Sequence, residues 1–344
     1  MVEENVAGRK KILLLSDEKM WRIMLTFAAF FKKMVLEIIL IILGIAVVLW
    51  GADRFTDGAC GLARRLKVSE LIIGLTVVSL GTSLPEFMVS FLSILRHSSN
   101  MSVGNVIGSN VFNILVIIGA SALLKPIKVE KSLLLRDIPV CLFVSFLLFV
   151  FAFSGGILNQ WEGLLLVLYF CAYLYMAYRV AMGDRRAAQA VSHAEQMSYP
   201  KIVLLVLIGI AALVGGGHVL VDNAASVARE WGVSESVIGM TILAAGTSLP
   251  ELATSVVAAS KGSHGLALGN AIGSNVFNIA FVLGFCSSVV PMAVTEITRL
   301  DWMMLVGSCA LVWLVAWTRR RLSRGEGILL VFCYVAYLVS LLLR

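Results

Sequence analysis

Charged residues are scarce in this 344-residue chain, and their scarcity excludes a water-soluble globular protein. Asp, Glu, Lys and Arg make up only 14% of the residues, whereas 59% are hydrophobic. A soluble domain carries roughly 25% charged residues. The six cysteines and four histidines are scattered, with no CxxC or CxxH spacing, so neither a disulfide framework nor a zinc site is predicted. The composition is that of an integral membrane protein.

The excess of basic residues does not indicate nucleic-acid binding. The formal net charge is +7, but the basic residues form no stripe and lie in short connections between apolar runs. That distribution is typical of the cytoplasmic loops of membrane proteins. The expected surroundings are therefore a lipid bilayer, with no nucleic-acid partner and no indication of an obligate protein partner.

Long apolar runs divide the chain into ten predicted transmembrane helices, because a bilayer core of ~30 Å requires about 20 apolar residues per helix. The most polar connection, 183–200, separates two sets of five helices. We therefore expect an N-terminal extension (1–33), a first unit (34–182), this linker and a second unit (201–344). The predicted spans are 34–50, 68–95, 103–123, 138–157, 161–182, 201–222, 236–260, 265–292, 302–318 and 326–343.

Two motifs recur at a constant offset of 165 residues. Residues 74–87 read GLTVVSLGTSLPEF and 239–252 read GMTILAAGTSLPEL; residues 104–114 read GNVIGSNVFNI and 269–279 read GNAIGSNVFNI. Each unit has an odd number of predicted spans, so the second must cross the membrane in the opposite sense. The repeat thus predicts an all-α membrane protein of two inverted five-helix repeats, with broken helices and a ligand site near the midplane.

The basic connections set the expected orientation. Both termini of the 34–344 core are predicted to be extracytoplasmic, in the plasma membrane. The basic residues of 1–33 disagree, and the apolar stretches of that segment are too short to span. We interpret 1–33 as preceding a natural start at Met34, with an atypical signal or an interfacial helix as the alternatives. The connections predicted to be cytoplasmic are 51–67, 124–137, 183–200, 261–264 and 319–325.

Two glutamates lie within apolar runs instead of at their ends. Glu86 lies between Glu70 and Arg96, and Glu251 occupies the equivalent place in the second repeat. A carboxylate at that depth costs several kcal/mol unless it is paired, so each indicates a functional site. A neutral, hydrogen-bonded carboxylic acid is the alternative for one isolated glutamate. Two glutamates in matching contexts favour a shared binding site.

Oxygen-bearing residues accompany both glutamates on predicted helical faces. Pro85 and Pro250 break the helices and free the carbonyls of Gly81 and Gly246, where the glycines are expected to let the chain unwind. Carboxylate, amide and hydroxyl oxygens are ligands of hard cations, which predicts a Ca²⁺ or Na⁺ site. Interhelical hydrogen bonding is the alternative for the serines and asparagines, and we favour it for Asn110 and Asn275. The other residues of these faces are Ser79, Thr82, Ser83, Ala244, Thr247 and Ser248, with Asn105, Ser109, Asn113, Asn270, Ser274 and Asn278 on the partner helices.

The duplicated GTSLPE and GNxIGSNVFNI motifs closely resemble the alpha repeats of the sodium/calcium exchanger family, within the cation/calcium antiporter superfamily. The resemblance covers essentially residues 34–343. The large regulatory domain of animal exchangers is not expected here, because the connection 183–200 is too short to hold it. It implies that Glu86 and Glu251 are the central Ca²⁺ ligands. It also implies that the Na⁺ sites and the middle of the cluster involve Thr82, Ser83, Thr247, Ser248, Ser109, Ser274, Asn113, Asn278 and carbonyls near Ser79 and Ala244.

One departure from that family concerns charge. Many relatives have an aspartate in one of the two central positions, whereas here both Asn113 and Asn278 are asparagine. The site then has two formal negative charges instead of three. This leaves the ion stoichiometry and any K⁺ dependence open.

The resulting prediction is a secondary antiporter, not an enzyme, that exchanges Na⁺ for Ca²⁺ by alternating access and needs no cofactor. By resemblance, the helices near 34–50 and 201–222 would slide across the core. The nearest alternative is an H⁺/Ca²⁺ antiporter whose glutamates are protonated in turn. A hydrolase with Ser83 or Ser248 as nucleophile is disfavoured because no histidine or lysine accompanies either serine in the motifs. A passive channel would show no counter-ion requirement.

Overall fold

The chain is almost entirely helical in the computed structural model, which describes residues 2–96, 98–188, 197–232 and 244–343. Within these ranges eight helices are long and apolar enough to span a membrane, and a bent pair, Glu70–Thr82 with Leu84–Leu95, makes a ninth. The predicted all-α membrane architecture is confirmed. The seventh of the ten predicted spans, 236–260, lies partly outside the described residues. Four strands of two residues each are an addition that the sequence did not predict.

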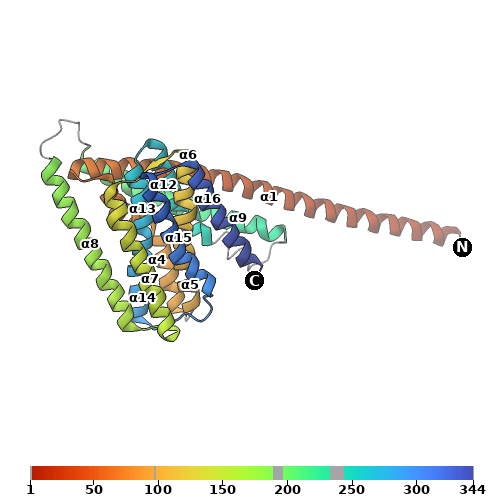
Figure 1. The fold of residues 1–344 in the computed structure, drawn as a ribbon. Helices are drawn as coiled ribbons and strands as arrows, with labels where there is room; N and C mark the ends of the chain where they lie inside the picture. The colour runs from red at the N-terminus through yellow and green to blue at the C-terminus, as the bar shows by residue number, and fades with distance from the viewer. Residues whose placement is uncertain (1, 97, 189–196, 233–243, 344) are drawn as a thin grey trace.

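The first repeat begins with a single long helix, α1 (Val2–Leu66), which extends well beyond the bundle (Figure 1). The predicted connection at 51–67 is wrong, because the helix continues through it. Gly51 and Gly58 do not break α1, since both pack against a helix of the second repeat. The elements that follow are α2 (Glu70–Ile73), the π-helical segment η1 (Gly74–Val78), α3 (Ser79–Thr82), α4 (Leu84–Leu95), α5 (Ser99–Phe112), η2 (Asn113–Ile117), α6 (Ile118–Leu124), β1 (Ile127–Lys128), η3 (Leu133–Asp137), α7 (Ile138–Gly155), β2 (Ile157–Leu158) and α8 (Gln160–Ala188).

The described elements of the second repeat follow the order of the first, except that no π-helical segment precedes α15. Its first helix, α9 (Tyr199–Glu230), is also longer than the predicted span of 201–222. The elements that follow in the described residues are α11 (Ala244–Thr247), α12 (Leu249–Lys261), α13 (His264–Val276), η5 (Phe277–Leu283), α14 (Gly284–Val289), β3 (Met292–Ala293), α15 (Arg299–Arg319), β4 (Arg321–Leu322) and α16 (Arg324–Leu342).

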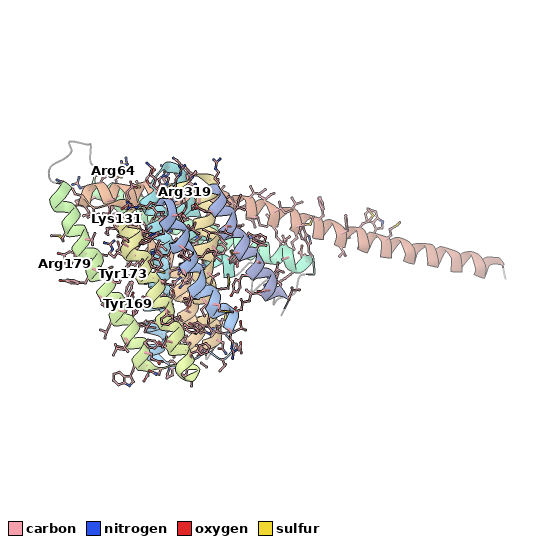
Figure 2. The ribbon with its side chains drawn as sticks, in the orientation of Figure 1. Arg64, Lys131, Tyr169, Tyr173, Arg179 and Arg319 are labelled. Carbon is pink, nitrogen blue, oxygen red and sulfur yellow. The ribbon has the colours of Figure 1, made fainter. Side chains whose placement is uncertain are left out.

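Two short antiparallel ribbons relate the repeats to each other. Strand β1 pairs with β4, and β2 pairs with β3. At the 165-residue offset β1 corresponds to β3, and β2 to β4, so each ribbon joins one strand from each repeat. Figure 2 shows Arg64, Lys131 and Arg319 at the same end of the bundle, and they come from connections predicted to share one side of the membrane. The assignment of that end to the cytoplasm remains a prediction.

Helices α1 and α9 pack against each other through glycines. A Cβ added to Gly51 of α1 would lie 2.7 Å from the Cβ of Ala212, and one added to Gly209 of α9 would lie 2.6 Å from the Cβ of Phe55. Such close backbone approach requires residues without side chains, as is common between transmembrane helices. The two helices therefore form one closely packed pair.

A second glycine-lined contact places the motif of the second repeat beside that of the first. Gly265, Gly269 and Gly273 of α13 recur every four residues and therefore share one face of the helix. A Cβ on Gly269 would lie 2.7 Å from the carbonyl oxygen of Leu71, and one on Gly273 would lie 2.7 Å from that of Leu75. Helix α13 thus lies directly on α2 and η1, and its polar residues reach the first repeat.

Candidate cation site

The two GTSLPE motifs form broken helices. Ser83 separates α3 from α4 with φ −87° and ψ 10°, and Ser248 separates α11 from α12 with φ −90° and ψ 9°. The first of these breaks bends the chain by 46°. A proline lies in the first turn of each following half-helix, where its missing N–H leaves no hydrogen bond unmade. The proline-induced break was predicted correctly.

The position of the unwinding differs from the prediction. Gly81 remains helical within α3, and the single non-helical residue is Ser83. A Cβ at Gly81 would lie 3.3 Å from Cδ1 of Ile210 on α9 and 3.5 Å from Cζ of Phe55 on α1. The glycine therefore admits the α1–α9 pair close to the break, and it does not act as the hinge itself.

Both glutamates lie in the protein interior. Glu86 is in the first turn of α4 and Glu251 in the first turn of α12, and the exposed fraction of each is 0%. The free N–H groups at a helix N-terminus carry a partial positive charge that favours a carboxylate there. Among the described residues no lysine, arginine or histidine forms an ion pair with either glutamate. Among the described side chains, no basic partner therefore neutralises the two carboxylates, and the helix N-termini favour them only in part.

Serines from opposite repeats hold the two carboxylates. Ser83 Oγ donates a hydrogen bond to Glu251 Oε1 at 2.7 Å, and Ser248 Oγ donates to Glu86 Oε1 at 2.9 Å. Ser83 and Glu86 lie on one segment, and Ser248 and Glu251 on the other. The crossed hydrogen bonds therefore bring both acidic residues into one cluster at the interface between the repeats.

Asn105 and Asn270 stabilise the backbone beneath the glutamates. Asn105 Nδ2 donates to the carbonyl of Glu86 at 3.3 Å and to Ser90 Oγ at 3.0 Å. In the second repeat, Asn270 donates in the same way to the Glu251 carbonyl at 3.2 Å and to the equivalent serine, Ser255, at 2.9 Å. Neither serine was predicted from the sequence, although each follows its glutamate by four residues and the two correspond at the repeat offset.

Two hydroxyls of the first motif already donate hydrogen bonds within the protein. Thr82 Oγ1 lies 3.1 Å from the Val78 carbonyl and 3.0 Å from Asn270 Oδ1, while Ser79 Oγ donates to the Thr76 carbonyl. Both side chains are buried. Only their lone pairs are then available to a cation.

The second motif is less completely described. Ala244 begins α11 and Thr247 ends it, with the threonine only partly buried. The ion-binding roles predicted for Ser79 and Thr82, and for Ala244 and Thr247, stay predictions.

Six buried oxygens of this region have no hydrogen-bond partner in the described structure. Three come from each repeat, at equivalent positions, and they comprise carboxylate, amide and hydroxyl oxygens. Buried polar atoms without partners are rare in native proteins and call for an explanation. A hard cation supplies one, because Ca²⁺ takes 6–8 oxygen ligands. The atoms are Oε2 of Glu86 and Glu251, Oδ1 of Asn113 and Asn278, and Oγ of Ser109 and Ser274.

The partner helices change geometry where the central asparagines occur. Asn113 is the first residue of η2, and Asn278 lies in η5. A π-helical turn contains an extra residue, and such turns are frequent at functional sites. The α-helical face expected for Asn105, Ser109 and Asn113 is kept up to the start of η2, because the N–H of Asn113 still bonds to the carbonyl of Ser109. On this face Asn105 contacts the Glu86 backbone, while Asn113 leaves Oδ1 without a partner in the described structure.

Comparison with known proteins shows the family of this chain. The pattern of the family described as "Sodium/calcium exchanger protein" matches residues 36–179 and 201–343. The chain is 38% identical to the "Putative antiporter CaxA" of Alkalimonas amylolytica, over 88% of this chain and 98% of the relative. It is 33% identical to the "Sodium/calcium exchanger MaX1" of Methanosarcina acetivorans, over 88% and 97% respectively. The solved structure of the sodium-calcium exchanger NCX_Mj superposes with a TM-score of 0.77 at 32% identity, covering 89% of this chain and 99% of that one.

Proposed function

The chain belongs to the sodium/calcium exchanger protein family, and on that premise we propose that it exchanges Na⁺ for Ca²⁺ at the site built around Glu86 and Glu251. Family membership makes it a cation/Ca²⁺ antiporter; Na⁺ as the coupling ion is our proposal. The observation that carries the proposal is the set of six buried oxygens without partners, of which four are neutral.

The charge of the site explains why Na⁺ and Ca²⁺ would compete. Two carboxylates with no basic partner are neutralised by one Ca²⁺ or by two Na⁺. Because both ions need the same oxygens, they exclude each other from the site. A buried uncompensated charge is costly, so the site changes sides more readily when it is loaded than when it is empty. Exchange follows from this difference.

The neutral oxygens favour Na⁺ over H⁺ as the coupling ion. A proton needs only a carboxylate to carry it, and amide or hydroxyl oxygens would add nothing. Na⁺ is a hard cation that takes several oxygen ligands, so Asn113, Asn278, Ser109 and Ser274 would have a direct role. A third Na⁺ would move net charge and make transport respond to voltage, at about 2.3 kcal/mol per charge per 100 mV.

The closely packed α1–α9 pair is the proposed moving element. Its helices contact each other through backbone at Gly51 and Gly209, and it meets the rest of the bundle near the helix break through Phe55 and Ile210. We place the protein in the plasma membrane, with the end that carries the β1–β4 ribbon in the cytoplasm, because that end gathers the basic connections.

The function is tested by Ca²⁺ uptake into vesicles that contain the purified protein and an outward Na⁺ gradient, with pH clamped on both sides. We expect uptake by the unsubstituted protein and a loss of at least about 100-fold in Glu86→Gln and Glu251→Gln, since each variant removes one of the two negative charges. Glu296→Gln, at an exposed residue of the connection before α15, serves as the matched control and should transport normally.

The same assay distinguishes the alternatives. Uptake that follows a pH gradient and ignores Na⁺ would establish the H⁺/Ca²⁺ antiporter. Uptake that needs no counter-ion would establish a channel. Normal flux in either glutamine variant would exclude this site as the transport site.

A further inference from the structure

Asn110 and Asn275 clasp each other across the interface between the repeats. Asn110 Nδ2 donates to the backbone carbonyl of Asn275 at 3.3 Å, and Asn275 Nδ2 donates to that of Asn110 at 3.0 Å. Both side chains are completely buried. They correspond to each other at the repeat offset, so the arrangement has the same pseudo-two-fold symmetry as the serine–glutamate bonds.

This clasp determines which way four amides face. A backbone carbonyl only accepts, so the atom that contacts it must be Nδ2, and Oδ1 of each clasping residue is turned the other way. Oδ1 of Asn110 accepts from Asn278 Nδ2 at 3.2 Å, and Oδ1 of Asn275 accepts from Asn113 Nδ2 at 3.0 Å. With their nitrogens engaged, Asn113 and Asn278 retain Oδ1 as the free end of the amide, and these oxygens belong to the set without partners.

We propose that Asn110 and Asn275 are positioning residues that make the central asparagines present oxygen, and not NH₂, to the transported cation. The inference rests on the proposed function of the site. A carboxylate has two equivalent oxygens and needs no such control. An amide in the reversed orientation would direct hydrogen-bond donors at a cation. The clasp is thus the feature that allows this chain to use asparagine at both central positions, Asn113 and Asn278.

The structure also specifies which residue controls which. Asn110 orients Asn278, and Asn275 orients Asn113, whereas Asn110 makes no bond to the Asn113 side chain within the described hydrogen bonds. Coupling should therefore be found across the repeats and not between residues of the same helix. A general packing role would not produce this pattern.

A double-mutant cycle on the apparent KM for Ca²⁺ tests the assignment. We expect Asn278→Ala and Asn110→Leu each to raise KM by about tenfold, as for the loss of one hydrogen bond to a charged group. The KM of the double variant N110L/N278A should exceed that of either single variant by no more than about twofold, because the two changes remove the same ligand. N110L/N113A should instead raise KM by about 100-fold, since independent effects multiply.

The mirror-image pair Asn275→Leu and Asn113→Ala repeats the cycle if N110L does not fold. If N110L/N278A raised the KM for Ca²⁺ by about 100-fold, as N110L/N113A is expected to do, the positioning role would be overturned. Absence of Ca²⁺ uptake in the unsubstituted protein would instead remove the proposed function, so the two failures are distinguishable.

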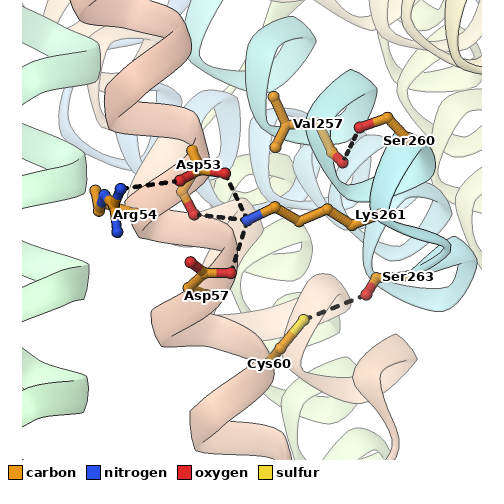
Figure 3. Close-up of polar contacts among 8 residues, drawn as sticks. All are labelled: Asp53, Arg54, Asp57, Cys60, Val257, Ser260, Lys261 and Ser263. Atoms are coloured by element: carbon orange, nitrogen blue, oxygen red, sulfur yellow. Dashed lines mark hydrogen bonds and ion pairs between the residues drawn. The ribbon is translucent and has the colours of Figure 1, made fainter.

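A separate observation concerns the ion cluster at the end of α12. Figure 3 shows Lys261 reaching from α12 toward two acidic residues on α1. Its Nζ lies 2.7 Å from an Oδ1 of Asp53 and 2.7 Å from an Oδ1 of Asp57. Close by, Cys60 Sγ lies 3.4 Å from Ser263 Oγ. These contacts join the α1–α9 pair to the half-helix that carries Glu251.

The repeat offset identifies a second pair of the same kind that is apart in this structure. Asp57 corresponds to Asp222 on α9, and Lys261 corresponds to Arg96 at the end of α4. Asp222 and Arg96 are both exposed, and neither forms an ion pair among the described residues. Because the repeats are inverted, this second pair belongs to the opposite end of the bundle from Lys261.

We infer that the two ion pairs form alternately during transport: Lys261–Asp57 closes one end in the present state, and Arg96–Asp222 closes the other after α1 and α9 have moved. Since these helices are packed as one pair, a single displacement separates the first contact and brings the second together. Partly exposed ion pairs contribute little to stability, which is what a contact that must be broken in every cycle requires. This inference rests on transport by alternating access.

Cys60 provides a probe for that movement. It is 7% exposed and lies beside the cluster, so its reaction with a water-soluble maleimide should report opening of that end. In a chain that retains only this cysteine and still takes up Ca²⁺, we expect faster labelling in Lys261→Gln and Asp57→Asn. Labelling should become slower in Arg96→Gln and Asp222→Asn, because the opposite closed state is then weakened.

The matched control is Lys128→Gln, an exposed basic residue in a connection of the same end that forms none of the described ion pairs. It should leave the labelling rate unchanged, while Lys261→Arg should preserve the closed end. The alternation would be overturned if the labelling rate of Cys60 changed in the same direction in the variants of both ion pairs, or if it changed in none of the four variants.

Discussion

Replacement of Gly209 by alanine tests whether α1 and α9 are a closely packed pair. The added Cβ would lie 2.6 Å from Cβ, 2.8 Å from Cα and 2.8 Å from the backbone nitrogen of Phe55. Ordinary carbon contacts are about 3.5–4.0 Å, and two of these three atoms are backbone, which cannot turn aside. The helices must therefore separate by about 1 Å along a contact that includes Gly51.

The expected magnitude follows from two opposing effects. Overpacking of this kind typically costs about 1–3 kcal/mol, and alanine gains up to about 1 kcal/mol over glycine in helix propensity. Gly215→Ala is the matched control, because the same substitution, on the same helix, meets nothing within 4 Å. The control keeps the propensity gain without the clash, so Gly209→Ala should be less stable than Gly215→Ala by about 1–3 kcal/mol.

Thermal unfolding in detergent measures the difference. At roughly 2 °C per kcal/mol for a chain of this size, the apparent Tm of Gly209→Ala should be about 2–6 °C below that of Gly215→Ala. Ca²⁺ uptake should fall as well if the pair moves as a unit. An apparent Tm for Gly209→Ala equal to or above that of the control would show that the two helices are not in backbone contact at this point.

Two further predictions concern the site. Ca²⁺ at about 100 times its Kd should stabilise the protein by about 2.7 kcal/mol and raise its apparent Tm; Glu251→Gln should show no comparable rise, and a full rise there would place the bound ion elsewhere. Asn270→Ala leaves the Glu251 carbonyl without its side-chain donor and should destabilise the protein by about 1–3 kcal/mol. Ser255→Ala removes only the neighbouring hydroxyl and should cost less; the reverse order in thermal unfolding would contradict this account.

The repeat offset explains why much of the architecture could be predicted from the sequence. Residues that are 165 positions apart in the sequence occupy equivalent places in the two repeats, as the strand pairings and the serine–glutamate bonds show. Burial of Glu86 and Glu251 was also predictable, since nothing in the flanking sequence would bring either to a membrane surface. These conclusions depend on periodicity and hydrophobicity, which a single sequence displays directly.

The remaining features depend on contacts between distant residues. The first span was predicted to end at residue 50 from its apolar run, whereas α1 continues to Leu66, and Gly51 and Gly58 pack there against α9. The contact of Asn105 with the Glu86 carbonyl could not be predicted, because Asn105 shares its helical face with Asn113 and the partners of both lie on other segments. Interhelical bonding by Asn110 was favoured from the sequence, but its partner was not identifiable.

The crossed serine–glutamate bonds have a consequence for biosynthesis. Glu86 accepts its hydrogen bond from Ser248, which is made 162 residues later. At about 5–20 residues per second, the ribosome needs roughly 10–30 s to reach that serine. Throughout this interval the carboxylate of the first half lacks its final partner, so the first five helices cannot reach their mature packing while they are alone in the membrane. Maturation of the first half must wait for the second half to be translated.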